Sequence, residues 1–123
     1  MISSLLLRVS TVLLIVGMVA GITMGIKQNF TFVPAHAHLN LVGGVLMFLA
    51  GLYYRLVPQA AVDALAKTQA ILHVVGAIVF PIGIAAVITN PRYEPLVIAG
   101  SLIVLSAIVL FAVIVFRTST SRA

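Results

Sequence analysis

Four long apolar segments, separated by short polar links, occupy nearly the whole of this chain. Crossing the hydrocarbon core of a bilayer takes about 20 apolar residues, so each segment is long enough to span it. We predict spanning helices over about 5–26, 34–57, 62–89 and 95–116. The links KQNFTF, PQAA and NPRYEP are short, which favours antiparallel neighbours. The sequence therefore predicts an all-α fold, with a single four-helix transmembrane domain over 1–123.

The composition excludes several other classes of protein. Hydrophobic residues make up 63% of the chain and charged residues 7%, against roughly 25% charged residues in a soluble domain. The chain has no cysteine, which excludes disulfides, c-type haem attachment and cysteine-ligated iron–sulfur clusters. The net charge is +5, but the basic residues lie at helix ends, where they determine topology. We therefore expect the lipid bilayer, and not nucleic acid, as the partner.

The lysines and arginines also predict the orientation in the membrane. Most of them fall on the side of the termini and the middle link: Arg8, Arg55, Lys67, Arg117 and Arg122. Lys27 and Arg92 fall in the other two links. Because cytoplasmic loops carry the excess of positive charge, we expect both termini in the cytoplasm.

Three histidines, His36, His38 and His73, carry the main functional signal. A histidine inside a membrane segment is a functional hypothesis by default, and imidazole is the commonest metal ligand. The alternative for His36 and His38 is solvation at the interface or a bond to a loop carbonyl. For His73, near mid-membrane, the alternative is a hydrogen bond to a neighbouring helix.

Helical spacing limits what these histidines can do together. Residues two apart point to nearly opposite faces, so one ion cannot easily bind both His36 and His38 from an intact helix. We expect His38 to face lipid or a neighbouring subunit. His36 shares its face with a polar and small stripe: Asn40, Gly43, Met47, Gly51 and Tyr54. The third segment carries a similar stripe: Gln69, His73, Gly76, Phe80 and Gly83. The glycines leave room for close helix packing or for a flat cofactor.

Depth along the helices adds a second limit. At 1.5 Å per residue from the middle link, His36 lies roughly 30 Å away and His73 roughly 20 Å. A haem iron takes two imidazoles at similar height, which one chain does not offer with this pair. Two copies of His36 from different chains would offer it.

The stretch HAHLNLVGGVLMFLAGLYYRLVP, residues 36–58, resembles the second helix of subunit I of the haem–copper oxidases, especially the bacterial nitric oxide reductase branch. There a histidine near the outer end is followed by an apolar stretch, a Tyr-Tyr pair and a proline, as in His36, Tyr53, Tyr54 and Pro58 here. The portion HLNLVGG also resembles short four-helix bacterial membrane proteins described as oxidase subunit I-like. The resemblance implies that His36 is an axial ligand of haem b in a bacterial inner membrane.

The resemblance also implies an oligomer. The oxidase subunit has twelve helices in three arcs of four, so three copies of a four-helix chain would rebuild its plan as a homotrimer. Its low-spin haem lies between the second helices of two arcs, which here would be two chains. His38 and His73 are the nearest candidates for its copper ligands. The adjacent His-His pair and the cross-linked tyrosine of that site are missing, so a complete oxygen- or nitric-oxide-reducing centre is not expected.

Other residues have supporting roles in this interpretation. Lys27 and Arg92 are candidates to neutralise haem propionates, the alternative being ordinary loop charges, and Asn40 is a candidate contact beside His36. Asp63 and Lys67 are spaced for an i, i+4 ion pair. The chain has no carboxylate pair and no nucleophile–base constellation, so we assign no catalytic residue.

The sequence thus favours a membrane haem b protein that transfers electrons or binds a diatomic gas, O₂ or NO. It does not specify the electron donor or whether a reaction is catalysed. One alternative is a copper- or zinc-binding membrane protein that uses His36, His38 and His73. Another is a cofactor-free structural or assembly protein.

Overall fold

The computed structural model describes residues 1–120, and within them the regular structure is helical, without strands. Four helical stretches are long and apolar enough to cross a membrane: α1 (Ile2–Lys27), Val33–Leu56, α5 (Ala66–Thr89) and Pro91–Thr120. The all-helical prediction with four helices of spanning length is confirmed, and the chain has the character of a membrane protein. Arg122, counted above among the cations near the termini, lies outside the described residues.

The second spanning stretch consists of three consecutive pieces. It begins as α2 (Val33–His38), continues as the π-helix η1 (Leu39–Leu46) and ends as α3 (Met47–Leu56). Pro34 lies in the first turn of α2, where its missing N–H leaves no hydrogen bond unmade. The π-helical turns were not predicted. In such turns the backbone hydrogen bonds join residues five apart instead of four, and π-helical turns are often found at functional sites.

The third spanning helix begins later than predicted. The PQAA link forms the short helix α4 (Pro58–Ala61), and α5 starts at Ala66 rather than near residue 62. The Asp63 carboxylate accepts a hydrogen bond from the Leu65 N–H at 2.9 Å, which holds a turn ahead of α5. The predicted ion pair between Asp63 and Lys67 is wrong, because Asp63 lies outside the helix. It pairs instead with Arg117, at 3.5 Å.

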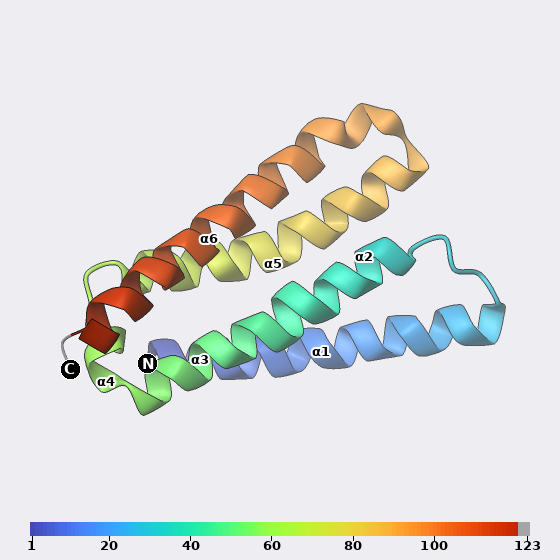
Figure 1. Cartoon of the computed structure of the whole chain (residues 1–123). Helices are drawn as coiled ribbons and strands as arrows, with labels where there is room; N and C mark the ends of the chain where they lie inside the picture. Colours follow the sequence, from blue (N-terminus) through green and yellow to red (C-terminus); the bar gives the residue numbers. More distant parts are fainter. Residues whose placement is uncertain (121–123) are drawn as a thin grey trace.

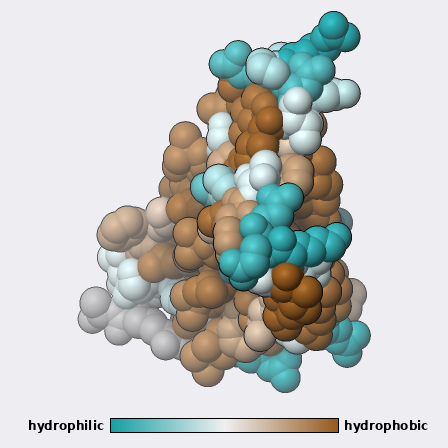
Figure 2. Space-filling model, turned by 90° about the vertical axis from the view of Figure 1, so that its right-hand side faces the viewer, coloured by the Kyte–Doolittle hydropathy of each residue, from teal (hydrophilic) through white to brown (hydrophobic). Residues whose placement is uncertain are grey.

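The helices pack as two pairs, which Figure 1 shows side by side. In one pair α1 runs along η1 and α3; in the other α5 runs along α6 (Glu94–Thr120), which follows the 3₁₀ turn η2 (Pro91–Tyr93). Both termini and α4 lie at one end, here called the terminal end. The connection 28–32 and η2 lie at the other, the distal end. Figure 2 faces the distal end and shows hydrophilic patches at the top and near the centre, with smaller ones at the lower edge, on an otherwise largely hydrophobic surface.

Glycines bring the helices of each pair close together. A Cβ on Gly43 would lie 2.9 Å from Leu13 Cδ1, and one on Gly51 would lie 3.1 Å from the Leu7 backbone nitrogen. A Cβ on Gly76 would lie 2.8 Å from a methyl carbon of Val104. Of the two explanations that the sequence left open for these glycines, close helix packing therefore applies.

Candidate functional site

His73 lies at the centre of a buried polar chain that joins α3, α5 and η1. The Tyr54 hydroxyl donates to Gln69 Oε1 at 2.9 Å, and Gln69 Nε2 lies 3.3 Å from His73 Nδ1. His73 Nε2 lies 3.1 Å from the Val42 carbonyl oxygen. Because a carbonyl only accepts, Nε2 carries the proton and Nδ1 accepts from Gln69. Both ring nitrogens are therefore engaged within the chain, in the neutral form of the imidazole.

We expect Tyr54→Phe to weaken this polar chain moderately. The substitution removes the donor to Gln69 Oε1, both side chains being nearly or fully buried. The expected loss in the free energy of unfolding is about 1 kcal/mol, measured by denaturant titration in mixed micelles. Tyr53→Phe is the matched control, because the half-buried Tyr53 hydroxyl bonds to Thr118 on the rim of the bundle. An equal or larger loss in Tyr53→Phe would contradict the central role of Tyr54.

His38, which we expected to face lipid or a neighbouring subunit, is half-buried and packs one side of its ring against α5 of its own chain. Its ring meets that of Phe80 on α5 edge-on, with centroids 4.9 Å apart and planes at 73°. Nδ1 lies 2.7 Å from the Pro34 carbonyl oxygen and therefore donates to it. Nε2 then keeps its lone pair and has no hydrogen-bond partner among residues 1–120.

His36 packs against α1 in a groove formed by two glycines. A Cβ on Gly21 would lie 2.8 Å from His36 Cε1, and a Cβ on Gly17 would overlap the side-chain oxygen of Asn40. Gly17, Gly21 and Gly25 recur at every fourth position of α1. This small-residue spacing in the segment GMVAGITMG is the sequence signal for the groove, and our reading of the sequence missed it.

The ring nitrogens of His36 make no strong bond within the chain. Asn40 Nδ2 lies 3.5 Å from Nδ1 and 3.4 Å from Nε2. These distances are long for a hydrogen bond, and an amide nitrogen nearly equidistant from both ring nitrogens does not lie along the in-plane lone pair of the one that accepts. Asn40 Oδ1 is buried without a hydrogen-bond partner in the described part of the chain. The His36 ring nitrogens and Asn40 Oδ1 thus lack short hydrogen bonds within the described residues.

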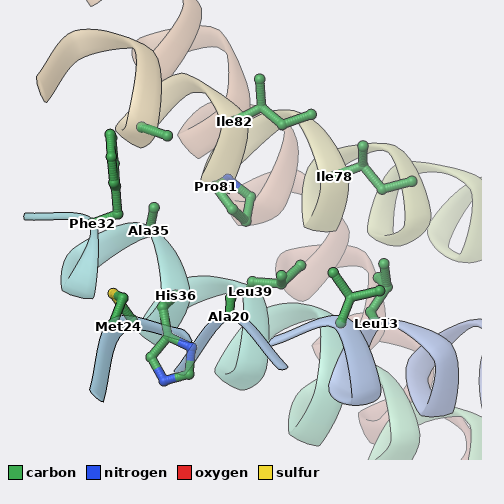
Figure 3. A pocket seen from close by; sticks show the side chains of 12 residues that line it. Leu13, Ala20, Met24, Phe32, Ala35, His36, Leu39, Ile78, Pro81 and Ile82 are labelled. Carbon is green, nitrogen blue, oxygen red and sulfur yellow. The ribbon is translucent and has the colours of Figure 1, made fainter. Parts of the chain in front are cut away.

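An apolar cavity of about 350 Å³ lies between α1, α2, η1 and α5. Its walls are hydrocarbon side chains, Met24 and Phe32 among them, with His36 as the only polar lining residue. Figure 3 shows the His36 ring turned away from Pro81 and Ile82, which form the opposite wall. His36 therefore borders this cavity with the part of the residue near its backbone, and its ring nitrogens point away from the cavity.

The other predicted site residues are spread over the molecule. Lys27 ends α1 and Arg92 lies in η2, so both are at the distal end, as is His36 near the start of α2. Neither cation forms an ion pair within residues 1–120. No group of three histidine or acidic side chains that could hold a metal ion forms within that part of the chain. A single chain therefore does not bring His36, His38 and His73 together as metal ligands.

No protein-family model, curated protein or solved structure matches this chain.

Proposed function

We propose that this chain is a membrane haem b protein, in which His36 provides an axial imidazole to a haem held between copies of the chain. The observation that carries the proposal is that the His36 ring nitrogens lack strong hydrogen bonds within the chain. The ring is half-buried, and neither nitrogen has a short hydrogen bond. His73, by contrast, uses both nitrogens inside the chain. A haem iron in such a setting would exchange single electrons or offer an open axial position to O₂ or NO.

The cavity that His36 borders does not suit a haem bound to its imidazole. The apolar cavity of about 350 Å³ is at the small end for ligand sites, and the imidazole turns away from it. A haem ligated by His36 would accordingly lie at the surface of the chain, against a second copy. This agrees with the resemblance to oxidase subunit I, which favours a closed homotrimer of antiparallel four-helix chains.

The residues around His36 suit such a role in the following way. The glycine groove of α1 holds the ring orientation by packing, and the Asn40 amide lies beside the ring. Lys27 and Arg92, unpaired at the distal end within the described residues, would bind propionates. The free Nε2 of His38 would support the site, as a ligand from another copy or through a bound water.

A cofactor-free structural role is the second candidate, and the glycine groove favours it. His36 and Asn40 fill the space that Gly21 and Gly17 leave open, so both side chains already serve as packing elements. In that case the four helices would act as a membrane scaffold. A copper or zinc site is less well supported, because no three suitable side chains meet in the described residues.

Visible spectra of the purified chain, expressed with unrestricted haem supply, separate these candidates. We expect a Soret band and sharp reduced b-type bands after dithionite treatment. His36→Ala should abolish them, and added imidazole should restore them by filling the space left by the ring. His38→Ala is the matched variant: loss there as well would assign both imidazoles to the iron or its support. A colourless protein that stays colourless after haem addition would overturn the haem proposal, and metal analysis would then test copper and zinc.

A further inference from the structure

Two uncompensated cations line a groove at the terminal end of the molecule. The groove measures about 620 Å³ and lies between the first turns of α1 and α5. Arg8 contributes from α1 and Lys67 from α5, both with exposed side chains. Between and beside them the lining is largely apolar, with Leu5, Ala70 and Ile71 among its members.

No acidic side chain neutralises this pair. The whole chain has two acidic residues, of which Asp63 is paired with Arg117. The other, Glu94, begins α6 at the distal end. Because Asp63 forms its ion pair with Arg117 and not with Lys67, the positive charges of Arg8 and Lys67 in the groove are not neutralised by an acidic side chain.

The depth of Arg8 lets its guanidinium reach the boundary between headgroups and hydrocarbon. The 26 residues of α1 extend about 39 Å, roughly 9 Å more than a hydrocarbon core of about 30 Å. Arg8 lies six residues from the helix start at Ile2, or about 9 Å along the axis. With the excess shared between the two ends, the Arg8 Cα lies about 4–5 Å inside the boundary, and its long side chain reaches back to headgroup level. Lys67 is the second residue of α5 and lies at that level, with Ala70 and Ile71 about one turn deeper.

We propose that this groove binds an anionic glycerophospholipid, with the phosphate between Arg8 and Lys67 and an acyl chain along Ala70 and Ile71. The arrangement combines a phosphate-binding pair of cations with an apolar trough at the level where a lipid presents both parts. Basic pockets between spanning helices are known to bind acidic headgroups. The site is independent of the haem proposal, because it lies at the opposite end from His36.

Native mass spectrometry of the full chain in detergent, titrated with phosphatidylglycerol or phosphatidylcholine, tests this proposal. We expect phosphatidylglycerol to bind more tightly. Arg8→Gln or Lys67→Gln should each weaken its binding about fivefold, and the double variant about 25-fold, since each interfacial cation contributes about 1 kcal/mol. Arg55→Gln is the control, because it removes an exposed charge from the same end but outside the groove. It should change the affinity less than twofold.

The outcomes are distinct for each competing explanation. Equal losses in Arg55→Gln and Arg8→Gln would show attraction to net charge alone and overturn the site. Equal binding of the two lipids, or unchanged binding in the double variant, would also overturn it. Competition by millimolar inorganic phosphate would indicate a site for free phosphate instead of lipid. Unfolding midpoints of the variants, all at exposed side chains, should match that of the wild type.

Discussion

Gly100→Ala should lower the free energy of unfolding by about 2–3 kcal/mol, and Gly100→Leu should separate α6 from α5. A Cβ on Gly100 would lie 2.7 Å from Phe80 Cα and 2.9 Å from the Phe80 nitrogen. On the facing helix, a Cβ on Gly83 would lie 2.9 Å from both Cα and N of Val97. The obstructing atoms are backbone in both cases, so no rotamer change can relieve the overlap, and the helices themselves must move apart.

Two measurements check this result. Denaturant titration in mixed micelles reports the stability of the alanine variant. Because the native chain has no cysteine, spin labels on introduced cysteines at the exposed positions Ile78 and Leu102 report the distance between α5 and α6 in the leucine variant. Gly25→Ala and Gly25→Leu are the matched controls, since a Cβ on Gly25 would meet nothing within 4 Å. An unchanged stability and label distance in the Gly100 variants would disprove backbone contact between these helices.

The sequence predicted the features that depend on composition and spacing along one helix. The four spanning stretches follow from runs of apolar residues too long for anything but a bilayer or a large core. The inward stripe of the second stretch follows from helical periodicity, and Gly43, Met47, Gly51 and Tyr54 are buried as expected. The role of its glycines in helix packing became clear only from the positions of the neighbouring helices in the structure.

Features that depend on contacts between helices were not predictable in the same way. His38 was expected to face outward because it lies opposite His36, but this stretch has neighbours on both sides. α1 covers the face of His36 and Phe80 of α5 covers that of His38. The turn ahead of α5 is held by hydrogen bonds from the Leu65 and Ala66 N–H groups to Asp63, and helix periodicity does not predict them. The π-helix has no side-chain signature of its own.

The buried polar chain through His73 ends on a backbone carbonyl of the π-helical stretch. A π-helix loosens the regular i→i+4 bonding of the backbone, and the Val42 carbonyl within η1 accepts from His73 Nε2. The His73 side chain is 0% exposed. We therefore expect His73→Ala to cost about 3 kcal/mol in the free energy of unfolding, from the cavity and from the partners lost by Gln69 and Val42. Hydrogen exchange of the backbone amides over residues 39–46 should also accelerate.

His38→Ala is the matched control, because it removes the same side chain from a half-buried position with one local bond to Pro34. It should cost less than about 1 kcal/mol and leave exchange over residues 39–46 nearly unchanged. His73→Gln should recover part of the lost unfolding free energy, because its amide N–H can still donate toward the Val42 carbonyl. If His73 only filled space, His73→Leu would be the more stable of the two variants. If His73→Leu is more stable than His73→Gln and exchange over residues 39–46 is unaffected, His73 fills space and does not hold η1. The π-helical geometry would then have to arise from the packing of Gly43 and Gly44 against α1 alone.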